Sequence, residues 1–370
     1  MTYKHNMHMM ANGLWTLPLA LTLAIAGCGT SATTDATETT AEETVETVDE
    51  EGTAEREAIT DDTDNGHAIA VSGEEASYEA VDVTKTGEAD GDEADFYGTN
   101  AAVYAEEGAT LSLDDITVTT DGTHANAVFS YGEGTTVNIS NSTISTTNTC
   151  SGGIMVTGGG TLNATDLDIH TTGNSSAAIR SDRGGGTENV TGGTYVTGGT
   201  GSPVIYSTAD VTVSDATLTS TASQGVVVEG KNSVTLNDVE LTASNTTKNS
   251  DKSDWYQAVM IYQSMSGDAA EGEASFTMDG GTLTNANGDI FFVNNTVASI
   301  SLSGATITNQ DADGVFLRAA AAGWGSEGSN GGHVTLNLAN EQLEGDILVD
   351  SVSELNAYLT EGTTYTGAID

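Results

Sequence analysis

The ten residues from position 137 read Val137-Asn-Ile-Ser-Asn-Ser-Thr-Ile-Ser-Thr146, and the chain repeats this pattern for most of its length. The pattern runs apolar, polar, mostly apolar, two polar, any residue, polar, apolar, and then Thr or Ser. Further copies lie at 111–120, 162–171, 211–220, 234–243, 276–285 and 300–309, with a degenerate copy at 188–197. Such internal repetition predicts a solenoid, in which each repeat stacks on its neighbours.

The fifth position of the repeat holds only Gly, Asn or Asp. The eight residues there are Asp115, Asn141, Asp166, Gly192, Asp215, Asp238, Gly280 and Gly304. These residue types adopt a positive φ at low steric cost. Each repeat is therefore predicted to be two short strands joined by one residue in the left-handed conformation.

A third apolar segment follows each pair of strands. Its cores are Ala102–Tyr104, Ala127–Phe129, Ile154–Val156, Ala178–Ile179, Val204–Tyr206, Val226–Val228, Val259–Ile261, Ile290–Val293, Val315–Leu317 and Ile347–Val349. Their centres lie about 22–33 residues apart, the spacing of one solenoid turn. No segment after the N-terminal signal shows a sustained 3.6-residue apolar period. The prediction is an all-β, right-handed parallel β-helix of about ten three-strand coils, stacked at ~4.8 Å.

The charge balance excludes two classes of partner. Lys and Arg number 9 and Asp and Glu 54, so the formal net charge is −45. Such a chain repels nucleic acid and anionic membrane surfaces, so no nucleic-acid partner is expected. The acidic surface is suited to collecting Ca²⁺ diffusely, and the sequence indicates no other cofactor.

The N-terminus predicts export and a lipid anchor. An apolar run at 14–26 ends in Leu23-Ala-Ile-Ala-Gly-Cys28, which resembles the lipobox of bacterial lipoproteins. The resemblance implies that residues 1–27 are a signal peptide, removed in the mature protein, and that Cys28 carries a diacylglyceryl group. The alternative is an ordinary secretory signal. With a lipid on Cys28, the protein is expected on the extracellular face of the cell membrane, held there by the anchor alone.

The composition predicts two further segments. Residues 28–66 are rich in Thr, Glu and Asp and lack aromatic residues, so we expect a disordered acidic tether. Residues 67–370 are expected to form the β-helix domain. Its first coil, at 67–86, is expected to be irregular, and its last coils, from 346 to 370, to taper.

The repeats and third strands together resemble the pectin-lyase-like superfamily, and especially the adhesin-like surface lipoproteins of bacteria. The resemblance covers about residues 67–370 and implies the parallel β-helix fold. It does not imply one activity, because this scaffold carries lyases, hydrolases, esterases and adhesins.

The scarce positive charges gather where each third strand meets the next coil. Seven Lys and Arg remain after Lys4 and Arg56 are set aside, and four of them lie at this corner. The predicted ligand-binding residues are Arg180, Asp182, Arg183, Lys231, Arg318 and Trp324, with Trp324 on an exposed loop. Two long loops, 262–275 and 318–333, flank a short turn at 294–299 and are expected to wall a groove.

Several functions stay open at this point. The leading hypothesis is a non-enzymatic adhesin or glycan-binding protein that contacts an anionic polysaccharide or another cell-surface partner at this corner. The superfamily resemblance implies as an alternative a polysaccharide lyase or glycoside hydrolase, with Arg183 or Lys231 as base and a Ca²⁺ held by Asp182, Glu229 and Asp210. A structural surface spacer, with the arginines in ion pairs, is the third. Cys150 is expected to be an isolated, small buried side chain.

Overall fold

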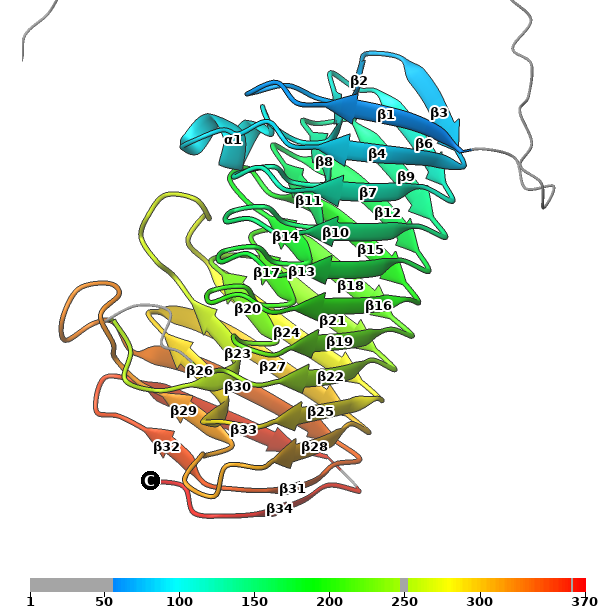
Figure 1. Cartoon of the computed structure of the whole chain (residues 1–370). Coiled ribbons are helices and arrows are strands. Elements are labelled where there is room, and N and C mark those ends of the chain that lie inside the picture. The colour runs from blue at the N-terminus through cyan, green and yellow to red at the C-terminus, as the bar shows by residue number, and fades with distance from the viewer. Residues whose placement is uncertain (1–55, 247–251, 361) are drawn as a thin grey trace, which may run out of the picture. The chain divides into compact units, whose positions relative to one another are not determined.

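The computed structural model describes residues 56–246, 252–360 and 362–370 (Figure 1). These residues form a right-handed parallel β-helix, so the predicted fold is confirmed. Three parallel sheets of ten or eleven strands run along the coils, and each coil up to β28 contributes one strand to each sheet. Cys28, the signal peptide and most of the expected tether lie outside the described residues.

The first sheet contains the strand that follows the left-handed residue. Its members are β1 (Glu57–Asp61), β4 (Val81–Lys85), β7 (Thr117–Thr120), β10 (Thr143–Thr146), β13 (Asp168–Thr171), β16 (Thr194–Thr197), β19 (Thr217–Ser220), β22 (Glu240–Ala243), β25 (Thr282–Asn285) and β28 (Thr306–Asn309).

The second sheet contains the predicted third strands. Its members are β2 (Ile69–Ser72), β5 (Val103–Glu106), β8 (Val128–Tyr131), β11 (Ile154–Thr157), β14 (Ile179–Ser181), β17 (Ile205–Ser207), β20 (Val226–Glu229), β23 (Gln257–Tyr262), β26 (Asp289–Asn294), β29 (Leu317–Ala319) and β32 (Ile347–Val349).

The third sheet contains the strand that precedes the left-handed residue. Its members are β3 (Glu75–Glu79), β6 (Thr110–Asp114), β9 (Thr136–Ser140), β12 (Gly160–Thr165), β15 (Gly186–Thr191), β18 (Asp210–Ser214), β21 (Ser233–Asn237), β24 (Glu273–Asp279), β27 (Thr296–Ser303), β30 (Gly332–Ala339) and β33 (Glu354–Leu359). Near the C-terminus, β31 (Gln342–Glu344) and β34 (Thr364–Thr366) form a separate pair.

The predicted hinge is confirmed at all eight positions. The φ angles of the five Asn and Asp residues lie between 49° and 56°, and those of the three glycines between 66° and 69°. The same turn recurs at Ala80 and Asn340, where φ is 54° at both. The pattern missed Ala80 because it is neither Gly, Asn nor Asp. It missed Asn340 because Ala339 precedes it and Glu344 stands where the pattern has Thr or Ser.

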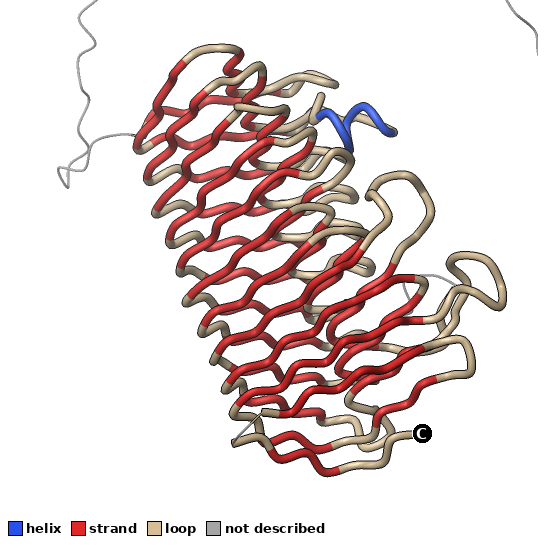
Figure 2. Tube along the Cα trace, turned by 180° about the vertical axis from the view of Figure 1, so that it is seen from behind, coloured by secondary structure: helices blue, strands red, loops and turns tan. Residues whose placement is uncertain are grey.

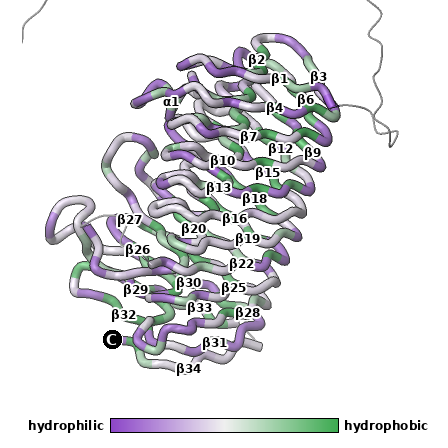
Figure 3. Tube along the Cα trace, in the orientation of Figure 1, coloured by the Kyte–Doolittle hydropathy of each residue, from purple (hydrophilic) through white to green (hydrophobic). Residues whose placement is uncertain are grey.

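The first apolar residue of the repeat forms one continuous stack inside the coils. The register joins Leu111, Val137, Leu162, Glu188, Val211, Val234, Phe276 and Ile300 in successive coils. Parallel stacking places like side chains on each other, so branched and aromatic residues fill the interior. Figure 3 shows that hydrophobic residues gather in the strands and hydrophilic residues at many of the turns. Glu188 is the one charged residue in this stack, and it is fully buried.

Two features at the N-terminal end differ from expectation. Regular structure begins before residue 67, because β1 pairs in parallel with β4 and Arg56 binds Asp82 at 2.8 Å. The first coil is also regular, since β2 pairs with β5.

A short helix, α1 (Asp92–Tyr97), projects between β4 and β5. Its first turn is acidic, which suits the positive end of a helix dipole, and Gly98 ends it in the left-handed conformation. Figures 1 and 2 show α1 and the long loops on the same side of the coils.

Candidate functional site

The outward face of the second sheet is largely covered, which the strand pattern alone did not indicate. One outward position per coil forms the stack Tyr104, Phe129, Met155, Arg180, Tyr206, Val227, Met260, Phe292 and Arg318. An outward strand residue normally faces solvent. Here most of these side chains are buried, because segments inserted between the coils fold over them.

Two apolar clusters make up this cover. Toward the N-terminus, Ala101, Tyr104, Phe129 and Met155 pack together, and His67 stacks on Tyr104 with ring centroids 4.5 Å apart. Toward the C-terminus, Trp324 packs with Val227, Met260, Phe292 and Ala320. Arg180 and Tyr206 lie between the two clusters, and Arg318 lies at the C-terminal end of the stack, so these two places hold the polar residues of the stack.

Arg180 and Asp182 form a buried polar pair at this point. Arg180 Nη2 lies 3.2 Å from Asp182 Oδ2 and 3.7 Å from Asp95 Oδ1 on α1. Burial raises the pKa of Asp182 to about 6, even though the Arg180 guanidinium acts in the opposite direction. Both residues line a cavity of about 200 Å³ that also contacts Tyr206. The predicted neighbours therefore lie together, but Arg180 is already neutralised by two carboxylates.

Arg183 is clamped between two inserted segments. Its Nε and Nη2 atoms donate to Asp268 Oδ1 at 2.9 and 2.7 Å. Its guanidinium lies 3.8 Å from the centroid of the Phe96 ring on α1, and Asp92 is 3.9 Å away. The bond to Asp268 raises the pKa of Arg183. Arg183 thus connects α1 to the 263–272 loop.

Arg318 and Trp324 do not present the expected open surface. Arg318 Nε donates to the buried Asp289 carboxylate at 2.6 Å, and its guanidinium lies 4.7 Å from the Trp255 ring centroid. The prediction that Trp324 is exposed is wrong, because only 8% of this residue is accessible. The 320s loop folds back on the second sheet and buries the indole, which contacts Tyr262 edge-on at 5.2 Å.

Glu229 ends β20, and Lys231 lies in the turn that follows. Lys231 is exposed, and its backbone N–H donates to Ala270 at 2.7 Å. Glu229 is buried and accepts hydrogen bonds from Tyr206 Oη at 2.5 Å, from Tyr262 Oη at 2.9 Å, and from the backbone and hydroxyl of Ser264. Burial raises the pKa of both tyrosines. The carboxylate is therefore fully engaged in holding the loop.

The suggested Ca²⁺ ligands are not assembled. Asp210 is exposed on β18 and accepts from Ser233 at 2.7 Å, whereas Glu229 is saturated and Asp182 faces Arg180. In the part of the chain that the structure describes, only Asp95, His124 and Cys150 bring three ligand atoms within 4.8 Å of one another.

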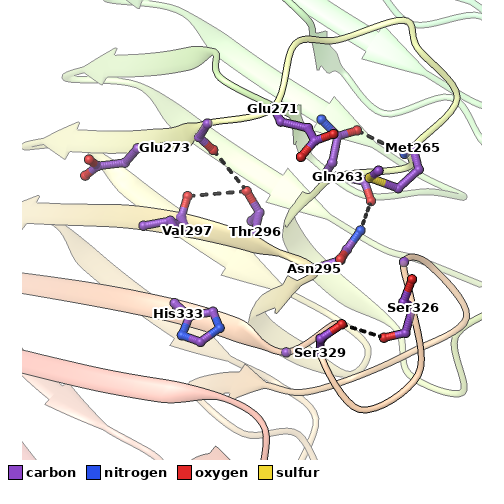
Figure 4. A pocket seen from close by; sticks show the side chains of 13 residues that line it. Gln263, Met265, Glu271, Glu273, Asn295, Thr296, Val297, Ser326, Ser329 and His333 are labelled. Carbon is purple, nitrogen blue, oxygen red and sulfur yellow. Dashed lines mark hydrogen bonds between the residues drawn. The ribbon is translucent and has the colours of Figure 1, made fainter.

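The two long loops do enclose a groove, as predicted. It has a volume of about 850 Å³ and lies between the 263–272 loop and the 325–331 loop, with Asn295–Val297 as its floor (Figure 4). Asn295 has a φ of 53°, and its side-chain amide donates to the Gln263 carbonyl at 2.8 Å. This bond ties the floor to one wall.

The groove combines polar groups with a small apolar area. Its polar lining includes Gln263, Glu271, Glu273, Asn295, Thr296, Ser326, Ser329 and His333. Met265 and Val297 are 55% and 49% exposed, and they are two of the six large hydrophobic side chains exposed in the described residues. The register places Glu273, Val297 and His333 side by side on β24, β27 and β30.

Sequence reasoning located the groove and the two loops that wall it, but it missed the hydrogen bonds that shape it. The signal was loop length, which does not show where each side chain points. Asn295, an Asn directly before a strand, carried a local hint of the left-handed conformation. The Glu229 bonds to Tyr206 and Tyr262 join three coils, and no short motif predicts them.

No helix among the described residues is long and apolar enough to cross a membrane. No protein-family model, curated protein or solved structure matches this chain.

Proposed function

We propose that this protein is a non-enzymatic, lipid-anchored surface protein that binds saccharide in the groove between its two long loops. The single observation that carries the proposal is the groove itself. The segment that carries α1 also interrupts the regular coils, but at the groove two insertions from different coils converge on one floor. Its volume lies within the usual range of small-ligand sites.

The lining favours an uncharged or amino-substituted sugar over an anionic one. Glu271 and Glu273 are acidic, and amides, hydroxyls and the imidazole of His333 supply the other polar groups. Val297 and Met265 offer the apolar surface against which the C–H face of a sugar ring packs. The arginines that were expected to attract an anionic glycan instead pair with carboxylates of the protein. The proposed ligand class therefore differs from the one expected at the basic corner.

The lyase alternative receives less support from the geometry. A catalytic base must release its own proton near neutral pH. Asp268 raises the pKa of Arg183, which moves that residue further from such a role. Glu229, one of the suggested Ca²⁺ ligands, already accepts hydrogen bonds from three residues.

A glycan array probed with the full chain tests the proposal. We expect binding to neutral or amino sugars, and a loss of at least ten-fold in Val297→Asp, because the new carboxylate occupies the apolar floor. The matched control is Thr212→Asp on β18, which is also on the outward face of the third sheet but lines no part of the groove. The control is expected to bind like the parent protein.

Three other results would contradict the proposal. Equal binding by the two variants would show that the saccharide does not bind in the groove. Release of unsaturated products or new reducing ends from any glycan would identify an enzyme. An array without any bound glycan would favour the structural spacer.

A further inference from the structure

A second cluster of reactive side chains lies on the same side of the coils, apart from the groove. Asp95 on α1, His124 in the turn after β7 and Cys150 in the turn after β10 place one ligand atom each within 4.8 Å of the others. His124 Nδ1 is 2.8 Å from Asp95 Oδ1. The side chains of His124 and Asp95 are 16% and 19% exposed, so an ion has access to a largely enclosed position.

The coil geometry explains why these residues meet. His124 and Cys150 occupy equivalent places in successive coils, since His124 N–H donates to Thr149 and Cys150 N–H donates to Asn174. Both are left-handed, with φ of 52° and 56°, as are Ser175 and Gly201 in the next two coils. Stacked positions lie about 4.8 Å apart. Helix α1 then brings Asp95 over the pair.

The donor set selects a class of metal. A thiolate, an imidazole and a carboxylate are the ligands of Zn²⁺, at about 2.0–2.3 Å from the ion. Ligand atoms around one tetrahedral ion are then about 3.3–3.8 Å apart. A group within 4.8 Å therefore needs little movement to bind one, and three protein ligands leave a fourth position for water.

The local charge also favours a divalent cation. Arg180 Nη2 lies near both Asp95 and Asp182, so two carboxylates face one guanidinium and the group carries one excess negative charge. Binding of a divalent ion with loss of the Cys150 thiol proton brings the group to neutrality. The positive charge of Arg180 opposes entry of the ion, and the two carboxylates outweigh it.

We propose that Asp95, His124 and Cys150 bind a divalent transition-metal ion, with Zn²⁺ preferred, and that the ion fastens α1 to the coils. The prediction that Cys150 is an isolated side chain is accordingly replaced. The proposal does not depend on the groove, because no residue is shared between the two sites.

Cobalt substitution provides a direct test. The full chain with Cys28→Ser has Cys150 as its only thiol. Titration with Co²⁺ in excess Mg²⁺ and salt suppresses diffuse binding to the acidic surface. We expect one ion per chain and a thiolate-to-cobalt charge-transfer band in the near ultraviolet, and competition with Zn²⁺ then gives the Zn²⁺ affinity.

Variants distinguish a specific metal site from nonspecific binding of metal ions to the acidic surface. Cys150→Ser is expected to abolish the band, and His124→Asn and Asp95→Asn to weaken Zn²⁺ binding at least ten-fold. Asn tolerates the left-handed conformation at position 124, and position 95 lies on a surface helix. The variants His124→Asn and Asp95→Asn therefore still test the site if Cys150→Ser does not fold. The control is His170→Asn, because His170 pairs with Asp168 at 3.2 Å but has no thiol in its cluster.

Two outcomes would overturn the proposal. One is a parent protein without the thiolate band. The other is an equal loss of Zn²⁺ affinity in His124→Asn and His170→Asn.

Discussion

Glu188 on β15 provides the sharpest test of the solenoid interior. It lies between Leu162 and Val211 in the inward stack and is fully buried. Neither carboxyl oxygen has a hydrogen-bond partner among the described residues. Burial raises the pKa of Glu188 well above its ordinary value of 4.5. Burial therefore favours the neutral acid in the folded protein.

The cost of that state depends on pH. An acid whose pKa is higher in the folded state makes its full contribution to stability at a pH below its unfolded-state pKa. That contribution is lost as the pH rises from the unfolded-state pKa to the folded-state pKa. Each pH unit between the unfolded-state and the folded-state pKa costs about 1.4 kcal/mol. The unsatisfied carboxyl group adds about 1–3 kcal/mol.

Two substitutions separate these contributions. Glu188→Gln removes the titration but leaves an unsatisfied polar group, so its stability advantage over the parent should grow from pH 5 to pH 7, by about 1.4 kcal/mol for each pH unit below the folded-state pKa. Glu188→Leu, which matches Leu162 in the preceding coil, removes both costs and should be the more stable variant at pH 7. Urea unfolding followed by circular dichroism at the two pH values measures both effects.

The control and the refuting result are direct. Glu240→Gln, at an exposed outward position on β22, should follow the parent at both pH values. If Glu188→Gln loses stability between pH 5 and pH 7 as steeply as the parent does, the carboxyl group is not held neutral in the core, and the inward register of β15 is wrong.

Three further predictions follow from the hinge, the anchor and the loop clamp. Asn141→Val should be about 1–2 kcal/mol less stable than Asn141→Gly in urea unfolding, because Asn141 is left-handed and a β-branched residue is strained there; equal stability would refute the hinge, and Thr143→Val is the control. Cys28→Ala should move the protein from the membrane fraction to the soluble fraction, and retention in the membrane would contradict the lipoprotein assignment. Asp268→Asn should speed proteolytic cleavage within 263–272, because it weakens the clamp on Arg183; an unchanged cleavage rate would show that the Glu229 bonds hold the loop without it.

The sequence by itself determined the coil. A left-handed turn depends on the residue that occupies it, so Gly, Asn and Asp at the fifth position predicted all eight hinges correctly. Alternating apolar residues predicted the strands and the inward stack for a similar local reason. Glu188 already stood at an apolar position of the degenerate repeat, which marked that coil as unusual.

The tertiary structure alone decided what covers the coils. Arg183 meets Asp268 and Phe96, and Asp95 meets His124, across inserted segments whose course no periodic pattern describes. Trp324 is buried because its loop folds back on Val227 and Met260, so a Gly-rich loop did not mean an exposed indole. The strands follow from short-range preferences that repeat, whereas the groove and the Asp95–His124–Cys150 cluster depend on long-range packing of insertions that each occur once.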